Sequence, residues 1–104
     1  MQMRLKWLPQ AIALLDEIYD FYATKSEQAA SKLYNRLLDS ANPLMIFPQA
    51  GIVEPLLQGY NKCFRSLVVE KHYKLIYTIT DDLIEIHAIW DCRQEENKLK
   101  DIFH

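Results

Sequence analysis

Three segments in the second half of the chain are rich in β-branched and aromatic residues, and only three residues separate each segment from the next. The segments cover residues 64–69, 73–79 and 83–90, and the breaks cover 70–72 and 80–82. Side chains of these types favour strands. Because connections this short join only antiparallel neighbours, the sequence predicts a three-stranded antiparallel meander.

The first 23 residues predict a strand followed by a helix. Apolar and polar residues alternate over positions 3–7, which is the period of a strand with one buried face. Proline suits the first turn of a helix, and apolar residues follow Pro9 at intervals of three and four through Tyr22. We expect this amphipathic helix to end near Ala23.

A second helix is expected after a short break. Ser26 suits the N-cap position, and apolar residues recur every four positions from Ala29 to Ala41. Asn42-Pro43 then predicts a kink or the start of a fresh short helix.

The order of these elements predicts a single α+β domain covering residues 1–104. An N-terminal strand and a helical hairpin would pack on one face of the antiparallel meander. Residues 52–57 would add at most a short edge strand, because Pro55 cannot donate to a sheet ladder. The other face of the sheet is expected to meet water or a binding partner. The apolar face of a short C-terminal helix could be formed by Leu99, Ile102 and Phe103.

Composition and charge limit the function classes. Twelve Lys and Arg against fourteen Asp and Glu give a formal net charge of −2, which is not the overall balance of a nucleic-acid-binding protein. No apolar stretch approaches the ~20 residues that a membrane span requires, and the N-terminus lacks the continuous apolar run of a secretion signal. We therefore expect a cytoplasmic protein without membrane contact.

The sequence predicts no cofactor and no metal. It contains no Gly-rich phosphate loop, no zinc-binding helix motif and no nucleophile elbow, and His72, His87 and His104 lack metal-ligand spacing. The two cysteines match neither a disulfide framework nor a zinc site. We expect Cys63 and Cys92 to be free, because the meander would hold them too far apart for a bridge.

The basic residues of the predicted sheet are candidates for the activity. Arg65 lies on the first strand of the meander, Lys74 on the second and Arg93 just beyond the third. A set of cations on an open sheet can hold phosphates and stabilise the charge that develops in phosphoryl transfer. The alternative is that these residues are solubilising charges near strand ends. Asp91 is either an orienting carboxylate or the surface ion-pair partner of Arg93.

His87 and the aromatic residues also have two interpretations each. An imidazole can act as a general acid, but strand alternation places His87 on the side of Glu85 and Ile89 and favours a hydrogen-bonded structural role. Aromatic side chains can stack on bases, but their helix and strand periods favour the core. The aromatic residues in question are Tyr19, Phe21, Tyr22, Tyr73, Tyr77 and Trp90.

A series of motifs follows the helical hairpin over the rest of the chain. In order they are Pro48-x-x-Gly51, Phe64-Arg-Ser-Leu-Val-Val69, Tyr73-Lys-Leu-Ile-Tyr77, Ile84-x-Ile86 and Trp90-Asp-Cys-Arg-Gln94. Their order and spacing resemble the RelE/ParE superfamily of bacterial type II toxins, found in plasmid-stabilisation systems. The resemblance implies a toxin that a cognate antitoxin neutralises by wrapping an extended or helical segment around it.

Two activities divide this superfamily. RelE-like members cleave messenger RNA in the ribosome with basic residues on the sheet, whereas ParE-like members poison DNA gyrase. Carried over by position, the basic positions fall on Arg65, Lys74 and Arg93, but a further basic position falls on Leu67 and the C-terminal tyrosine falls near Leu99. Leucine neither binds phosphate nor moves a proton, and lysine lacks the bidentate fork of arginine.

The closing Asp91-Cys-Arg93-Gln94 resembles the His-x-Arg ending of ParE-like members, with aspartate in place of the histidine. We therefore expect a ParE-like toxin that inhibits gyrase by protein binding, with Arg93 and then Arg65 carrying toxicity. The alternatives are a ribosome-dependent mRNA endoribonuclease with a partly degenerate site, acting on the ribosome and mRNA, and an inactive binding module. Without the antitoxin, self-association through uncovered apolar surface is expected.

Overall fold

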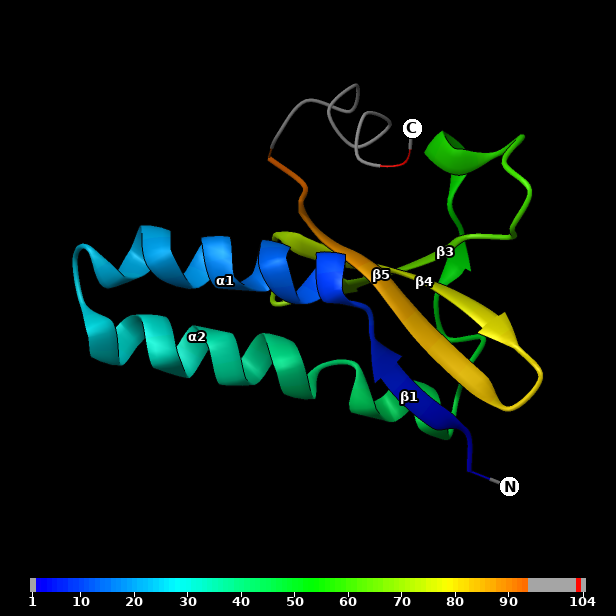
Figure 1. Cartoon of the computed structure of the whole chain (residues 1–104), viewed down its shortest axis with the longest axis horizontal. Coiled ribbons are helices and arrows are strands. Elements are labelled where there is room, and N and C mark those ends of the chain that lie inside the picture. The colour runs from blue at the N-terminus through cyan, green and yellow to red at the C-terminus, as the bar shows by residue number, and fades with distance from the viewer. Residues whose placement is uncertain (1, 94–102, 104) are drawn as a thin grey trace.

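The helical hairpin lies over one face of a five-stranded sheet in the computed structural model, which describes residues 2–93 and residue 103 (Figure 1). In chain order the elements are β1 (Arg4–Trp7), α1 (Pro9–Ala23), α2 (Glu27–Asp39), the 3₁₀ helix η1 (Asn42–Met45), β2 (Ile52–Val53), the 3₁₀ helix η2 (Pro55–Leu57), β3 (Arg65–Val69), β4 (Tyr73–Thr80) and β5 (Leu83–Asp91). The predicted strand, helical hairpin, edge strand and meander are confirmed. No helix in this part of the chain is both long and apolar enough to cross a membrane.

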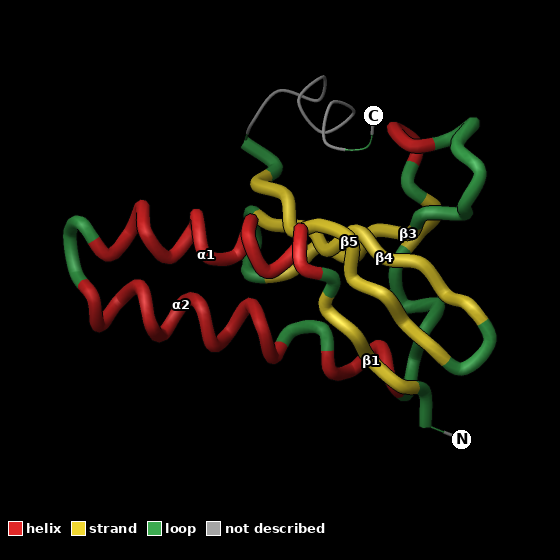
Figure 2. Tube along the Cα trace, in the orientation of Figure 1, coloured by secondary structure: helices red, strands yellow, loops and turns green. Residues whose placement is uncertain are grey.

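The sheet is mixed because β1 joins it in parallel. Its strand order is β1-β5-β4-β3-β2, and β3, β4 and β5 form the predicted antiparallel meander (Figure 2). β1 pairs with β5 from Arg4 opposite Leu83 to Trp7 opposite Ile86. The long stretch of chain between these two strands permits the parallel pairing, which a short connection would forbid.

Local sequence sets the starts of both helices. Pro9 takes the first position of α1, and the Ser26 hydroxyl oxygen caps α2 by accepting a hydrogen bond from the Ala29 N–H at 3.2 Å. The buried residues of α2 are Ala30 and Leu37, whereas Ala29, which the spacing placed in the buried stripe, is exposed. The chain then restarts as η1, as predicted.

Tyr77 connects β4 to the loop that follows η1. Its side chain is fully buried on the face under the helical hairpin, and its hydroxyl accepts a hydrogen bond from the Gly51 N–H at 2.9 Å and donates one to the Pro48 carbonyl at 2.8 Å. A Cβ at Gly51 would lie 2.5 Å from the Ser66 carbonyl oxygen, so this close approach requires glycine. The Pro48-x-x-Gly51 motif therefore has a structural role.

The second face of the sheet is covered at its centre, so the expectation of an open face is wrong there. Ile76, Ala88 and Trp90 are buried on this face in a cluster with Leu57 and Phe64. Leu57 and Phe64 lie at the two ends of the irregular segment between η2 and β3, for which no structural role was predicted. Large apolar residues in that segment provide the cover, because a sheet with two apolar faces must bury both.

A β-bulge places His87 on this second face. The register of β5 with β4 shifts at this point and leaves His87 without a partner residue. His87 Nε2 lies 2.9 Å from Thr78 Oγ1, and the ring packs edge-on against Phe64. Burial lowers the pKa of His87 below its usual range. The structural role is confirmed, but the expected common side with Ile89 is wrong, because Ile89 joins the core under the helical hairpin.

Two of the three apolar residues of the predicted C-terminal helix, Leu99 and Ile102, lie outside the described residues. Phe103 is described, and its ring lies 4.9 Å from that of Phe64, centroid to centroid. Cys63 and Cys92 are both free, as predicted, and both are exposed.

Candidate functional site

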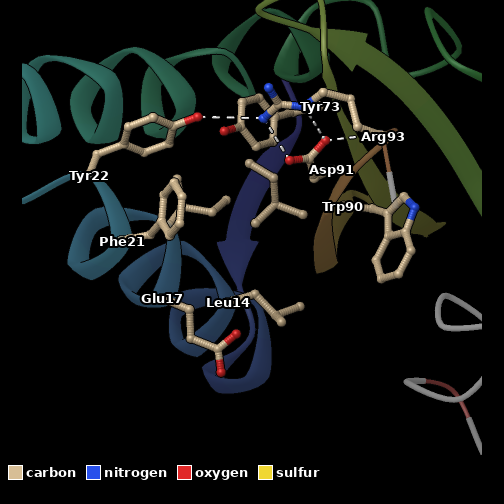
Figure 3. Close-up of a pocket in the computed structure, with 10 residues that line it drawn as sticks. Leu14, Glu17, Phe21, Tyr22, Tyr73, Trp90, Asp91 and Arg93 are labelled. Atoms are coloured by element: carbon tan, nitrogen blue, oxygen red, sulfur yellow. Dashed lines mark hydrogen bonds and ion pairs between the residues drawn. The ribbon is translucent and has the colours of Figure 1, made fainter. Parts of the chain in front are cut away.

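A groove of about 610 Å³ runs between α1 and the C-terminal end of β5. One wall is a face of α1 with residues at helical spacing, namely Leu14, Glu17, Ile18, Phe21 and Tyr22. The other wall comprises Tyr73, Ile89, Trp90, Asp91 and Arg93 (Figure 3). Aliphatic and aromatic side chains form most of the lining, and the charged pair of Asp91 and Arg93 lies beside Tyr22, away from Glu17.

Arg93 is held at one end of this groove by two groups. Its Nε and Nη2 atoms donate to the two carboxylate oxygens of Asp91 at 2.9 and 2.7 Å, and Nη2 also donates to the Tyr22 hydroxyl at 3.4 Å. The Arg93 main-chain N–H donates to the same carboxylate at 2.9 Å. Asp91 is therefore the ion-pair partner of Arg93, which was one of its two predicted roles. These hydrogen bonds hold the pKa of Asp91 below, and the pKa of Arg93 above, their usual values.

The held guanidinium remains available to a partner. The Arg93 side chain is 52% exposed, and its Nη1 atom has no hydrogen-bond partner among the described residues. The two N–H groups of Nη1, held in a fixed orientation, can donate charge-assisted hydrogen bonds to a carboxylate of a partner. Phe21, which is 62% exposed, lines the same groove, so the groove presents both a charged group and a large apolar side chain.

Arg65 has a structural contact near the β2 edge of the sheet, away from the groove. Its register partner in β4 is Tyr77, and its guanidinium donates to the Gly51 carbonyl at 2.9 Å. The side chain is half-buried and helps to hold the turn that Tyr77 also binds.

Lys74 lies on the second face of the sheet and is neutralised there. Its Nζ donates to Glu54 Oε1 at 2.8 Å, and the Ser66 hydroxyl donates to the other carboxylate oxygen. The Lys74 and Glu54 side chains are 16% and 3% exposed. Burial alone would raise the pKa of Glu54, but the hydrogen bonds from Lys74 and Ser66 outweigh it and lower that pKa.

The three candidate cations therefore lie at three separate places. Arg65 binds a turn, Lys74 is paired on the second face, and Arg93 lies beside α1. Neither the contact of Glu54 with Lys74 nor that of the Tyr22 hydroxyl with Arg93 was predicted. A single carboxylate within the apolar stretch 52–57 was the one local signal for a buried ion pair at Glu54.

The fold and the groove together define a small α+β protein with an arginine held beside an apolar surface, which suits binding to another protein. The chain belongs to the family of ParE toxins of type II toxin-antitoxin systems (parDE), whose family model matches residues 5–96. The predicted resemblance to the RelE/ParE superfamily is thereby confirmed.

A solved ParDE structure supports the same assignment. The chromosomal ParDE TA system from P. aeruginosa is 26% identical with a TM-score of 0.73, and the match covers 86% of this chain and 96% of that chain. The YoeB dimer from Staphylococcus aureus is 23% identical with a TM-score of 0.44, and the match covers 85% of this chain and 94% of that chain. None of the curated protein sequences compared with the chain matches it.

Proposed function

We propose that this toxin acts by binding DNA gyrase through the groove between α1 and β5, with Arg93 as the central charged contact. The observation that carries the proposal is the combination of a held guanidinium, whose Nη1 has no hydrogen-bond partner within residues 2–93, with the exposed ring of Phe21 in one groove. Arginine and aromatic side chains are the residue types that dominate protein–protein binding energy.

The positions of the other cations also support a binding protein over a nuclease. Phosphoryl transfer in RNA cleavage needs several cations converging on one phosphate. Lys74 is already neutralised by Glu54, and Arg65 donates to a carbonyl oxygen. Neither offers a free charge beside Arg93.

We further propose that the cognate antitoxin covers the same groove. An apolar surface of this kind is left uncovered by the described residues, and an amphipathic segment of the antitoxin would bury it. Toxicity would then be suppressed because Arg93 becomes inaccessible.

An Arg93→Ala variant tests the gyrase proposal. Inhibition of DNA supercoiling by purified gyrase should fall at least about tenfold, since a central arginine contact contributes ~1.4 kcal/mol or more. The free energy of unfolding should change by no more than about 1 kcal/mol, because the ion pair with Asp91 is at the surface.

Arg4→Ala is the matched control. Arg4 also forms a two-bond pair with an aspartate, Asp82, at 3.1 and 2.9 Å, but it lies on β1 and outside the groove. This variant should inhibit gyrase as the wild type does. Full inhibition by Arg93→Ala would refute the role of Arg93. Cleavage of messenger RNA in a purified translation system, without any effect on gyrase, would refute the proposed target.

A further inference from the structure

The turn between β3 and β4 has an unusual main chain. Val69 pairs with Tyr73, and within the three residues between them Glu70 and Lys71 have φ angles of 47° and 68°. This left-handed region costs roughly 1 kcal/mol or more for a residue with a long side chain, and glycine or asparagine occupies it more readily. The turn therefore carries two side chains that its conformation disfavours.

The contacts of Glu70 and Lys71 with the described residues do not offset the cost of this conformation. Glu70 pairs with Arg36 at 3.5 Å, but both side chains are at least one-third exposed, so the pair adds little stability. Within residues 2–93, no carboxylate lies within 4 Å of the Lys71 ammonium group. Backbone conformations of this cost are retained mainly where function uses them.

The turn is joined directly to the segment that carries Arg93. The Cys92 N–H donates to the His72 carbonyl at 2.6 Å, and Tyr73 pairs with Asp91. The end of β5 and the turn are thus neighbours in the sheet, and the surface around them presents Lys71, which has no carboxylate within 4 Å among residues 2–93, together with the exposed guanidinium of Arg93 and its partner Asp91.

We infer that the β3–β4 turn is a second contact for the toxin's target protein, in which Lys71 binds an acidic patch next to the one that Arg93 binds. This inference rests on the proposed function of the groove. Two cations on one edge of the molecule fit a surface with at least two carboxylates. The strained turn places the exposed Lys71 at the ends of β3 and β4, next to the segment that carries Arg93.

Lys71→Asn is the test variant, because asparagine removes the charge but tolerates the left-handed conformation better than lysine. Its melting temperature should equal or exceed that of the wild type, while its growth-arrest activity in cells and its gyrase inhibition should fall roughly fivefold. Lys71→Arg should retain both activities. Lys6→Gln, which removes an exposed lysine from β1 opposite Glu85 at the other end of β5, should behave as the wild type.

Salt provides a second measurement. Inhibition by the wild type should weaken more steeply with ionic strength than inhibition by Lys71→Asn, because one charge contact has been removed. Full growth arrest by a folded Lys71→Asn variant would overturn the inference while leaving the gyrase proposal intact. Loss of antitoxin binding with unchanged toxicity would also overturn it, since the turn would then contact the antitoxin. If the wild type arrests growth without inhibiting gyrase, the proposed target fails, and the growth-arrest comparison still tests Lys71.

Discussion

Removal of the Lys74 ammonium group should destabilise the protein strongly and leave its mode of action unchanged. The structure gives Lys74 one role, which is to neutralise Glu54 on the second face of the sheet at 2.8 Å. Lys74→Ala would leave a carboxylate that is 3% exposed, with the Ser66 hydroxyl as its remaining side-chain partner among the described residues. A buried charge without its counterion is among the few changes that cost several kcal/mol.

The size of the effect follows from the burial of the two groups. Loss of one partner from a fully buried pair costs about 3–5 kcal/mol. Lys74 is 16% exposed and Glu54 keeps its bond to Ser66, so we expect about 2–3 kcal/mol, or roughly 10 °C in melting temperature for a chain of this length. The double variant Glu54→Gln/Lys74→Met leaves no unpaired charge and should lie within about 1 kcal/mol of the wild type.

Urea unfolding of the wild type, Glu54→Gln, Lys74→Met and the double variant gives the coupling free energy between the two residues. A loss below about 0.5 kcal/mol in Lys74→Ala would refute the buried pair. Toxicity measured below the melting temperature of Lys74→Ala should remain near the wild-type level, whereas a nuclease that needed this cation would lose much of its rate.

The same pair predicts acid sensitivity. The pKa of Glu54 is lowered in the folded protein, so the carboxylate contributes stability above its unfolded pKa of about 4.5, and this contribution is lost as the pH falls through the folded value. The free energy of unfolding should therefore decrease between pH 5 and more acid values. Glu54→Gln should show a smaller decrease over the same range.

Three further predictions concern the turn at Gly51 and the thiols. Tyr77→Phe removes both hydrogen bonds to the turn and leaves the Gly51 N–H and the Pro48 carbonyl unsatisfied, so a loss of about 2–3 kcal/mol is expected in urea unfolding, and an unchanged midpoint would contradict it. Gly51→Ala should cost at least 1 kcal/mol because its Cβ would lie 2.5 Å from a main-chain oxygen, and a neutral result would show that the turn can shift. Thiol titration of the unreduced protein should find two thiols per chain, Cys63 and Cys92, and fewer would contradict the sheet topology.

Much of the fold follows from short-range sequence signals. Three-residue breaks allow only antiparallel connections, so the meander could be predicted without its tertiary context. Pro9 and Ser26 set the starts of the two helices through main-chain constraints that act within one turn. The ion pair of Asp91 and Arg93 could also be predicted from the sequence, because only one residue separates its members.

The contacts of the functional residues required the tertiary structure. Lys74 pairs with a carboxylate 20 positions away in the sequence, and the Arg93 guanidinium donates to the hydroxyl of a tyrosine 71 positions away. The bulge at His87 reverses the expected alternation only because β4 and β5 shift register there. Propensity and loop length act over a few residues, whereas these contacts depend on how the hairpin, the irregular segment and the sheet close on one another. Short-range sequence signals thus establish the elements and the family, whereas the packing of those elements places the three basic residues at separate sites.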